Sequence, residues 1–202
     1  MIGKLTINRQ IYLPAILAHF FALALCLPVA AQQSVAERIV EAAGVKPGMI
    51  IGEAGAGTGG YTFPLAGRVG ENGRIYANDI DTRALAQLER RCEQTQVTNI
   101  TTVVGEIVDP LFPVGDLDMI FMRYVFHHLE DPVSWMKNVI PYMKPDAPMV
   151  IVERDTNKTK TGRDHFMSEE EVLEIMAETD FVLDRTDYRF GVDNIYFFTL
   201  KR

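Results

Sequence analysis

The chain has 202 residues, of which 48% are hydrophobic and 23% are charged, and its formal net charge is −7. This length and composition predict one globular domain with a buried core and exclude the disordered class. An acidic chain in which no basic patch stands out is not expected to bind nucleic acid, because contacts to phosphates need a positive protein face.

The first 31 residues differ in character from the rest of the chain. They combine a basic start, an almost entirely apolar stretch over residues 11–27, and small residues that end at Ala31. This pattern predicts a secretory signal peptide, residues 1–31, cleaved after Ala31, so that the protein is exported to the periplasm or secreted and keeps no membrane span. The alternative is a retained anchor in the inner membrane, since residues 11–31 are long enough to span a bilayer.

Residues 32–202 are expected to form a single domain in which helices and strands alternate. Serine followed three residues later by glutamate predicts helix starts at Ser34 and Ser168, and runs rich in β-branched residues predict strands. The predicted helices cover 34–43, 61–69, 82–93, 131–143 and 168–179, and the predicted strands cover 49–53, 74–78, 99–104, 118–122, 149–152, 181–188 and 194–200.

The order of these elements predicts an α/β fold. Apolar strands that alternate with helices favour a parallel sheet covered by helices on both faces. The link between the last two strands, residues 189–193, is too short for a parallel crossover, so these strands are expected to pair as an antiparallel hairpin. The prediction is therefore a seven-stranded, mostly parallel sheet with a C-terminal antiparallel hairpin.

A glycine-rich loop, EAGAGTGG at residues 53–60, follows the first predicted strand. The spacing of Gly55, Gly57 and Gly60 matches the fingerprint G-x-G-x-x-G of dinucleotide sites, which leaves an NAD(P)-dependent oxidoreductase as one alternative. In the other register, Glu53 precedes three glycines spaced by one residue. A carboxylate there suits a ligand that carries an ammonium or sulfonium group, and it has little purpose beside a pyrophosphate.

Polar residues also follow the other predicted strands. Asp79 ends the second strand, Glu106 follows the third and Arg123 follows the fourth. Because ligands of open parallel sheets bind beyond the carboxyl ends of the strands, these residues are expected to share one site with the glycine loop. A carboxylate at the position of Asp79 can accept hydrogen bonds from the hydroxyls of a ribose.

Together these segments make the chain resemble the class I S-adenosylmethionine-dependent methyltransferase family over nearly all of residues 34–202. The resemblance is carried by IIGEAGAGTG at 50–59, IYANDI at 75–80, GE at 105–106, DMIF at 118–121, HHLEDP at 127–132 and MKP at 143–145. It implies a Rossmann-like fold, S-adenosylmethionine as cofactor, and transfer of its methyl group to an acceptor.

The resemblance also implies a role for each residue of the predicted cofactor site. It places Asp79 on the ribose hydroxyls, Ile80 on the adenine face, and Glu106 near the adenine amino group with Ile107 beside it. It places Arg123 near the methionine portion and the substrate. The methionine portion itself would be held by Glu53, Ala54, Gly55, Ala56, Gly57 and Gly59.

The acceptor is predicted only by class, as a small molecule or a lipid-like compound, because the pattern Asn-Pro-Pro-Tyr of methylases that act on bases or glutamine is absent. His127 and His128 are the candidate catalytic residues, since histidine titrates near working pH and a weakly acidic acceptor needs a base. Asp155, His165 and Tyr61 are weaker candidates, and no metal ligand set is predicted.

Two further alternatives stay open. Arg123 could pair with an anionic acceptor or with a neighbouring acid, Asp116 or Asp118. The whole domain could also be a methyltransferase-like binding protein without turnover, because fold does not determine function.

Overall fold

The computed structural model describes residues 33–160 and 165–201. The predicted signal peptide, residues 1–31, lies outside the described residues. The helices are α1 Val35–Ala42, α2 Thr62–Val69, α3 Thr82–Thr95, α4 Pro132–Val139 and α5 Glu169–Ala177, with short 3₁₀ helices at Phe126–His128 and Ile140–Tyr142. The strands are β1 Ile50–Ala54, β2 Arg74–Asp79, β3 Ile100–Val104, β4 Met119–Arg123, β5 Met149–Arg154, β6 Phe181–Phe190 and β7 Asp193–Leu200.

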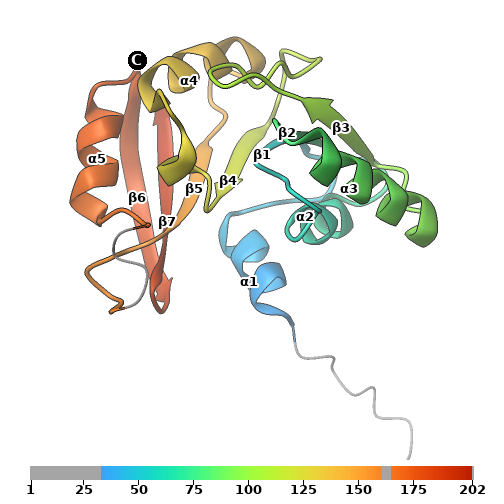
Figure 1. The fold of residues 1–202 in the computed structure, drawn as a ribbon, viewed down its shortest axis with the longest axis horizontal. Coiled ribbons are helices and arrows are strands. Elements are labelled where there is room, and N and C mark those ends of the chain that lie inside the picture. The colour runs from blue at the N-terminus through green and yellow to red at the C-terminus, as the bar shows by residue number, and fades with distance from the viewer. Residues whose placement is uncertain (1–32, 161–164, 202) are drawn as a thin grey trace, which may run out of the picture. The chain divides into compact units, whose positions relative to one another are not determined.

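These strands form one seven-stranded sheet in the order β3-β2-β1-β4-β5-β7-β6. Strands β1 to β5 are parallel, and β7 runs antiparallel to both β5 and β6. The predicted Rossmann-like α/β sheet and its antiparallel hairpin are therefore confirmed. Figure 1 shows β1 and β4 in the middle, with β2, β3 and α3 on one side and β5, β7, β6 and α5 on the other.

The order of the strands creates a topological switch point at the centre of the sheet. From β1 the chain builds outward through β2 and β3, and then returns to place β4 on the other side of β1. The loops that leave the carboxyl ends of β1 and β4 therefore diverge to opposite faces and open a crevice between them.

Alternating side chains of the strands feed two hydrophobic cores, one on each face of the sheet. In β4, Met119 and Phe121 pack in the cluster that includes apolar residues of α1, α2 and α3. Ile120 and Met122 pack in the cluster that includes residues of α4 and α5. This period of two is expected for strands that are covered on both faces.

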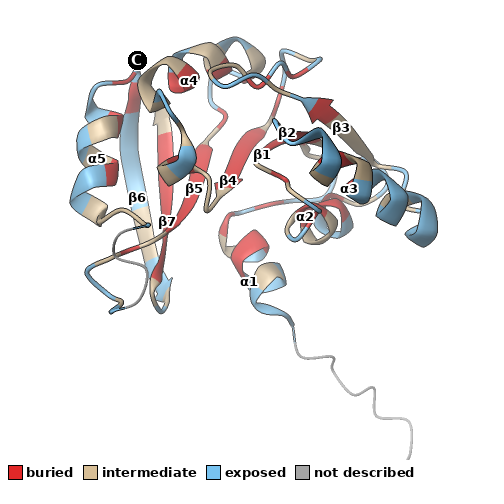
Figure 2. Cartoon of the chain, viewed as in Figure 1, coloured by how far each residue is buried: buried red, intermediate tan, exposed pale blue. Residues whose placement is uncertain are grey.

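Burial separates the central strands from the edge. Figure 2 shows most of β4, β5 and β7 as buried, whereas β6 is exposed along much of its length. Charged residues of β6, such as Asp184 and Arg185, occupy exposed positions, and charge on an edge strand disfavours pairing with another chain.

The predicted helix starts are confirmed. Ser34 and Ser168 each form a reciprocal capping box with the glutamate three residues later, and Asp81 accepts hydrogen bonds from two backbone amides at the start of α3. Of the helices in the described part of the chain, none combines the length and the apolar character that crossing a bilayer requires.

Several predicted boundaries were wrong by one to four residues, and two of these differences have a clear physical cause. The helix expected over residues 131–143 ends at Val139 and continues as a 3₁₀ turn, because Pro141 supplies no backbone N–H for an α-helical bond. The fifth strand extends two residues past its predicted end, since Glu153 and Arg154 pair with Asn194 and Asp193 of β7. That extension positions Glu153 in the sheet.

Two glycines, one packed closely and one in open space, test how tightly the core on the α4 and α5 face is packed. A Cβ atom on Gly52 in β1 would lie 2.8–2.9 Å from atoms of Phe112, Ile120 and Leu117, whereas a Cβ on Gly67 in α2 meets nothing within 4 Å. We expect Gly52→Ala to lower the free energy of unfolding by about 1–3 kcal/mol, as overpacking does. The matched Gly67→Ala should raise it by about 0.5–1 kcal/mol, because alanine favours a helix. Urea unfolding of both variants gives the comparison, and equal stabilities would contradict the packing described.

Candidate functional site

Two adjoining pockets lie at the carboxyl ends of the central strands. The larger, which we call the main pocket, has a volume of about 280 Å³ and is lined by Ala54, Gly55, Asn78, Asp79, Ile80, Glu106, Ile107, Tyr124, Val125, His128, Leu129, Glu130 and Trp135. The smaller, the loop pocket, has a volume of about 140 Å³ and is lined by Glu53, Gly55, Ala56, Gly60, Tyr61 and Arg123. The structure thus gathers most of the predicted site residues at one crevice.

The glycine loop is shaped by its contact with the segment after β4. Gly55 has a φ of +67°, and a Cβ there would lie 2.1 Å from Cγ2 of Val125. A residue with a side chain would therefore meet both strain and collision at this position. Gly59 is also part of the framework, because a Cβ there would lie 2.6 Å from Leu88 of α3. The close approach of the glycine loop to Val125, in the segment after β4, thus depends on glycine.

Glu53, the acidic residue before these glycines, is buried, and one of its carboxyl oxygens is left unpaired. Its side chain is 3% exposed, and its Oε2 has no hydrogen-bond partner among the residues that the structure describes. Burial raises the pKa of Glu53 to about 7, the hydroxyl of Thr62 opposes the rise, and the charge of Asp79 adds to it. A buried carboxyl oxygen without a partner is rare in folded proteins and indicates a group that a ligand completes.

Asp79, at the end of β2, is in contrast firmly held. Its Oδ2 accepts a hydrogen bond of 2.8 Å from the backbone N–H of Gly57, and its Oδ1 accepts one of 2.9 Å from that of Asp81. Each carboxylate oxygen has a second lone pair, so acceptor positions remain on the side that lines the main pocket. Asp79 therefore links the glycine loop to β2 and still offers a carboxylate to the pocket.

The far end of the main pocket offers apolar surface and a carboxyl group. Ile80 and Ile107 are 62% and 52% exposed, although both are large apolar residues. Glu106 is exposed beside them, and its backbone N–H donates to the carbonyl of Asp109 over 2.7 Å. Two exposed isoleucines and a carboxyl group at one pocket suit a flat ring with an amino group.

Arg123 closes the loop pocket from the end of β4. Its guanidinium lies 4.6 Å from the centroid of the Tyr61 ring and 3.6 Å from that of Tyr124. Its carboxylate neighbour is Asp193 of β7, at 3.9 Å, rather than Asp116 or Asp118. The Nε of Arg123 is buried without a hydrogen-bond partner in the described part of the chain. The loop pocket thus presents an acidic side chain, Glu53, and a basic side chain, Arg123.

Asp118, the acid that the sequence offered to Arg123, serves the sheet instead. It accepts hydrogen bonds from the backbone N–H of Ile50 and from Nζ of Lys144, at 2.8 and 2.6 Å. Tyr124 belongs to the cluster around Asp193, because its hydroxyl donates to Asp193 over 2.6 Å and accepts from Arg154 over 3.1 Å. Asp193 could not be found from the sequence, since its role depends on the pairing of β5 with β7.

The two candidate histidines lie in the 3₁₀ helix Phe126–His128, which follows β4. His127 Nδ1 lies 2.8 Å from Glu153 Oε2, and the side chains are 2% and 1% exposed. His128 lines the main pocket. Burial is the largest cause that lowers the pKa of His128, and the neighbouring His127 and His165 lower it further.

Sequence reasoning missed Glu153, because the fifth strand was expected to end one residue earlier. The available signal was an acidic residue directly after the apolar run of residues 149–152, at the end of a strand next to β4. Asp155, which was a candidate, is buried and accepts from the backbone of Asn157 and the side chain of Asn194. It lines neither of the two pockets and has a structural role.

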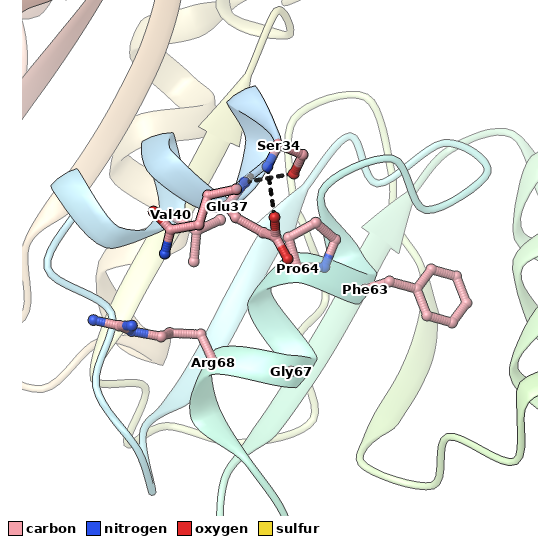
Figure 3. Close-up of a pocket in the computed structure, with 8 residues that line it drawn as sticks. Ser34, Glu37, Val40, Phe63, Pro64, Gly67 and Arg68 are labelled. Carbon is pink, nitrogen blue, oxygen red and sulfur yellow. Dashed lines mark hydrogen bonds between the residues drawn. The ribbon is translucent and has the colours of Figure 1, made fainter. Parts of the chain in front are cut away.

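A further hollow lies between α1 and α2, away from the strand ends. It has a volume of about 500 Å³ and is lined by Gln33, Ser34, Glu37, Val40, Phe63, Pro64, Gly67 and Arg68. Figure 3 shows that Ser34 and Glu37 are joined by the two hydrogen bonds of the capping box, at 2.6 and 3.2 Å. The polar groups of this hollow therefore stabilise a helix terminus, and the crevice at the strand ends is the candidate site.

Comparison with known proteins agrees with this geometry. Residues 51–146 match a family model described as a methyltransferase domain. The chain is similar in fold to a SAM dependent methyltransferase from Aquifex aeolicus, with a TM-score of 0.77, 23% identity, and coverage of 83% of this chain and 90% of that one.

Curated relatives match a shorter segment. A demethylmenaquinone methyltransferase of Bacillus mycoides is 24% identical over 109 residues, which cover 54% of this chain and 46% of the relative. A nocamycin O-methyltransferase of Saccharothrix syringae is 28% identical over 86 residues, which cover 43% of this chain and 31% of the relative. The chain thus aligns with less than half the length of these relatives.

The buried carboxyl group of Glu53 makes stability depend on pH. Its pKa is about 7 in the folded protein against 4.5 as the ordinary value, so its contribution to stability is present below pH 4.5 and is lost as the pH rises through 7. We expect Glu53→Gln to raise the free energy of unfolding by roughly 3 kcal/mol at pH 8 and by roughly 1 kcal/mol or less at pH 5.

Urea unfolding at the two pH values measures this difference. Glu106→Gln is the matched control from the same crevice, because Glu106 is exposed and its replacement removes no buried carboxyl group. A Glu53→Gln variant that is no more stable than the natural chain at pH 8 would contradict the burial of an uncompensated charge.

Proposed function

Because the chain belongs to the class I S-adenosylmethionine-dependent methyltransferase family, we propose that it transfers the methyl group of S-adenosylmethionine to a small-molecule acceptor. The observation that supports this most directly is the buried Oε2 of Glu53, which has no hydrogen-bond partner within the described residues, in a loop pocket that Arg123 also lines. An amino-acid ligand carries an ammonium and a carboxylate, which match these two charges. A pyrophosphate would bring negative charge beside Glu53, which disfavours the NAD(P)-dependent oxidoreductase.

The residues of the crevice match the parts of S-adenosylmethionine one after another. Glu53 and the loop residues Ala54, Gly55, Ala56, Gly57 and Gly59 would hold the methionine portion, with Arg123 at its carboxylate. Asp79 would accept hydrogen bonds from the ribose hydroxyls, since its remaining lone pairs line the main pocket. The exposed Ile80 and Ile107 would cover the adenine, and Glu106 would accept from its amino group.

When bound, S-adenosylmethionine supplies a methyl group on a positively charged sulfur, which needs no further activation. The work left to the protein is to align the acceptor with that carbon and to exclude water. An acceptor that starts as a weak acid must also lose a proton. We assign this task to the side of the crevice that holds His127 and His128, where Glu153 fixes the orientation of the His127 ring.

The acceptor is proposed as a small or lipid-like molecule. The names of the relatives, which refer to demethylmenaquinone and nocamycin, are consistent with that class. Export through the predicted signal peptide, residues 1–31, is also a proposal, and N-terminal sequencing of the mature protein checks it. An intact Met1 would favour the retained anchor over residues 11–31.

Calorimetric titration with S-adenosylhomocysteine tests the cofactor site. We expect Glu53→Gln and Asp79→Asn each to weaken binding by about tenfold to a hundredfold, because each removes a charged hydrogen-bond acceptor. Glu71→Gln, a change in the turn after α2, should leave the affinity unchanged. Binding of NADH together with no binding of S-adenosylhomocysteine would favour the oxidoreductase.

Turnover is tested separately, with methyl-labelled S-adenosylmethionine and small-molecule extracts as the source of acceptors. A labelled product is expected with the natural chain and should be absent with Glu53→Gln at low cofactor concentration. Cofactor binding without any labelled product would favour the non-catalytic binding protein.

A further inference from the structure

Three histidines from two separate segments meet beside the main pocket. One ring nitrogen from each of His127, His128 and His165 lies within 4.8 Å of those of the other two. The centroid of the His127 ring lies 4.1 Å from that of His128 and 4.8 Å from that of His165. The centroids of His128 and His165 are 5.0 Å apart. His127 and His128 follow β4, whereas His165 precedes α5, so tertiary folding brings the group together.

Glu153 prepares one of these rings to bind a metal. His127 Nδ1 contacts the Glu153 carboxylate at 2.8 Å, and that carboxylate also accepts from the backbone N–H of Arg154 at 3.1 Å. A carboxylate accepts hydrogen bonds, so Nδ1 carries the proton and Nε2 keeps a lone pair. Metal-ligating histidines have this arrangement, in which the second nitrogen donates to a carboxylate that orients the ring.

The nitrogen that remains available on His127 has no hydrogen-bond partner within the described residues. Nε2 is buried, and the His127 side chain as a whole is 2% exposed. The aromatic ring of Phe166 packs against His127 and His165 with centroids 4.8 Å away in each case, and it cannot supply a hydrogen bond. Packing of aromatic rings alone explains the contacts, but it leaves this buried lone pair unused.

We propose that His127, His128 and His165 bind one divalent transition-metal ion, with zinc as the best match. Neutral imidazole nitrogens suit zinc and similar ions, whereas calcium and magnesium require oxygen ligands. In a tetrahedral zinc site the ligand nitrogens lie about 3.4 Å apart, so binding draws the three rings closer together. Three protein ligands leave one coordination position open, as in catalytic zinc sites.

The open coordination position of the metal indicates the chemical class of the methyl acceptor. This step rests on the proposed function. His128 lines the main pocket together with Asp79 and Tyr124, so the metal borders the space assigned to the cofactor. A bound divalent ion lowers the pKa of an oxygen ligand. The acceptor is then a hydroxyl compound, such as a phenol, whose oxygen binds the metal and releases its proton to solvent. An oxygen–carbon bond forms as the carbon–sulfur bond breaks, which yields a methyl ether and S-adenosylhomocysteine.

Metal binding is tested on the full chain without a histidine tag, after treatment with EDTA. Calorimetric titration with Zn²⁺ should show one ion per chain, and Co²⁺ should produce visible absorption bands of a site with nitrogen ligands. His165→Ala should weaken Zn²⁺ binding by at least a hundredfold. Glu153→Gln, a change in a positioning residue, should weaken it by tenfold to a hundredfold. Glu71→Gln, a change of a carboxylate in the turn after α2, should leave it unchanged.

Absence of Zn²⁺ binding, or equal affinity in the natural chain and His165→Ala, overturns the metal site. Addition of catechol to the Co²⁺ form should shift its absorption bands, and an unchanged spectrum overturns the hydroxyl acceptor. Binding of S-adenosylhomocysteine should be the same in His165→Ala and the natural chain. If the natural chain binds Zn²⁺ but not S-adenosylhomocysteine, the proposed methyl transfer fails while the metal site stands.

Discussion

The close approach of the glycine loop to the segment after β4 is the constraint on which the rest of the site depends. Strands β1 and β4 are neighbours in the centre of the sheet, and Gly55 meets Val125 with no space for a side chain. This contact joins the two sides of the crevice, whose main pocket is lined by cofactor-site residues such as Asp79 and by His128. The crevice lies at the topological switch point between β1 and β4, where the loops after these neighbouring strands lead to opposite faces of the sheet.

Around this crevice the fold holds polar groups that it does not satisfy by itself. Glu53 Oε2, Arg123 Nε and His127 Nε2 are all buried without hydrogen-bond partners in the described chain. They come from β1, from the end of β4 and from the 3₁₀ helix that follows it. Such groups lower the stability of the free protein, and they are expected where a site is organised for a ligand before the ligand arrives. Two opposite charges in the loop pocket suit an amino acid, and the imidazole lone pair suits a metal or a proton.

Most of the fold could be predicted because its signals are local. Capping boxes mark the starts of α1 and α5, apolar runs mark the strands, and the short link before Asp193 requires an antiparallel pair. The errors have causes that compete with the pattern, and one of them is local whereas the other comes from the tertiary structure. Pro141 ended a helix that hydrophobic spacing would have continued, and pairing with β7 extended β5 beyond its apolar run to include Glu153.

The sequence by itself determined the order of the strands and helices, the glycine loop, and the presence of Glu53 and Asp79 at strand ends, because each depends on neighbours within a few positions. Only the tertiary structure decided the partners of the remaining side chains. The contact of His127 with Glu153 spans 26 positions and that of Tyr124 with Asp193 spans 69, and His165 reaches the other histidines from a separate segment. Contacts between distant segments follow no spacing along the chain, since they arise from the pairing of β4, β5 and β7 in the sheet and from the packing of the segment before α5.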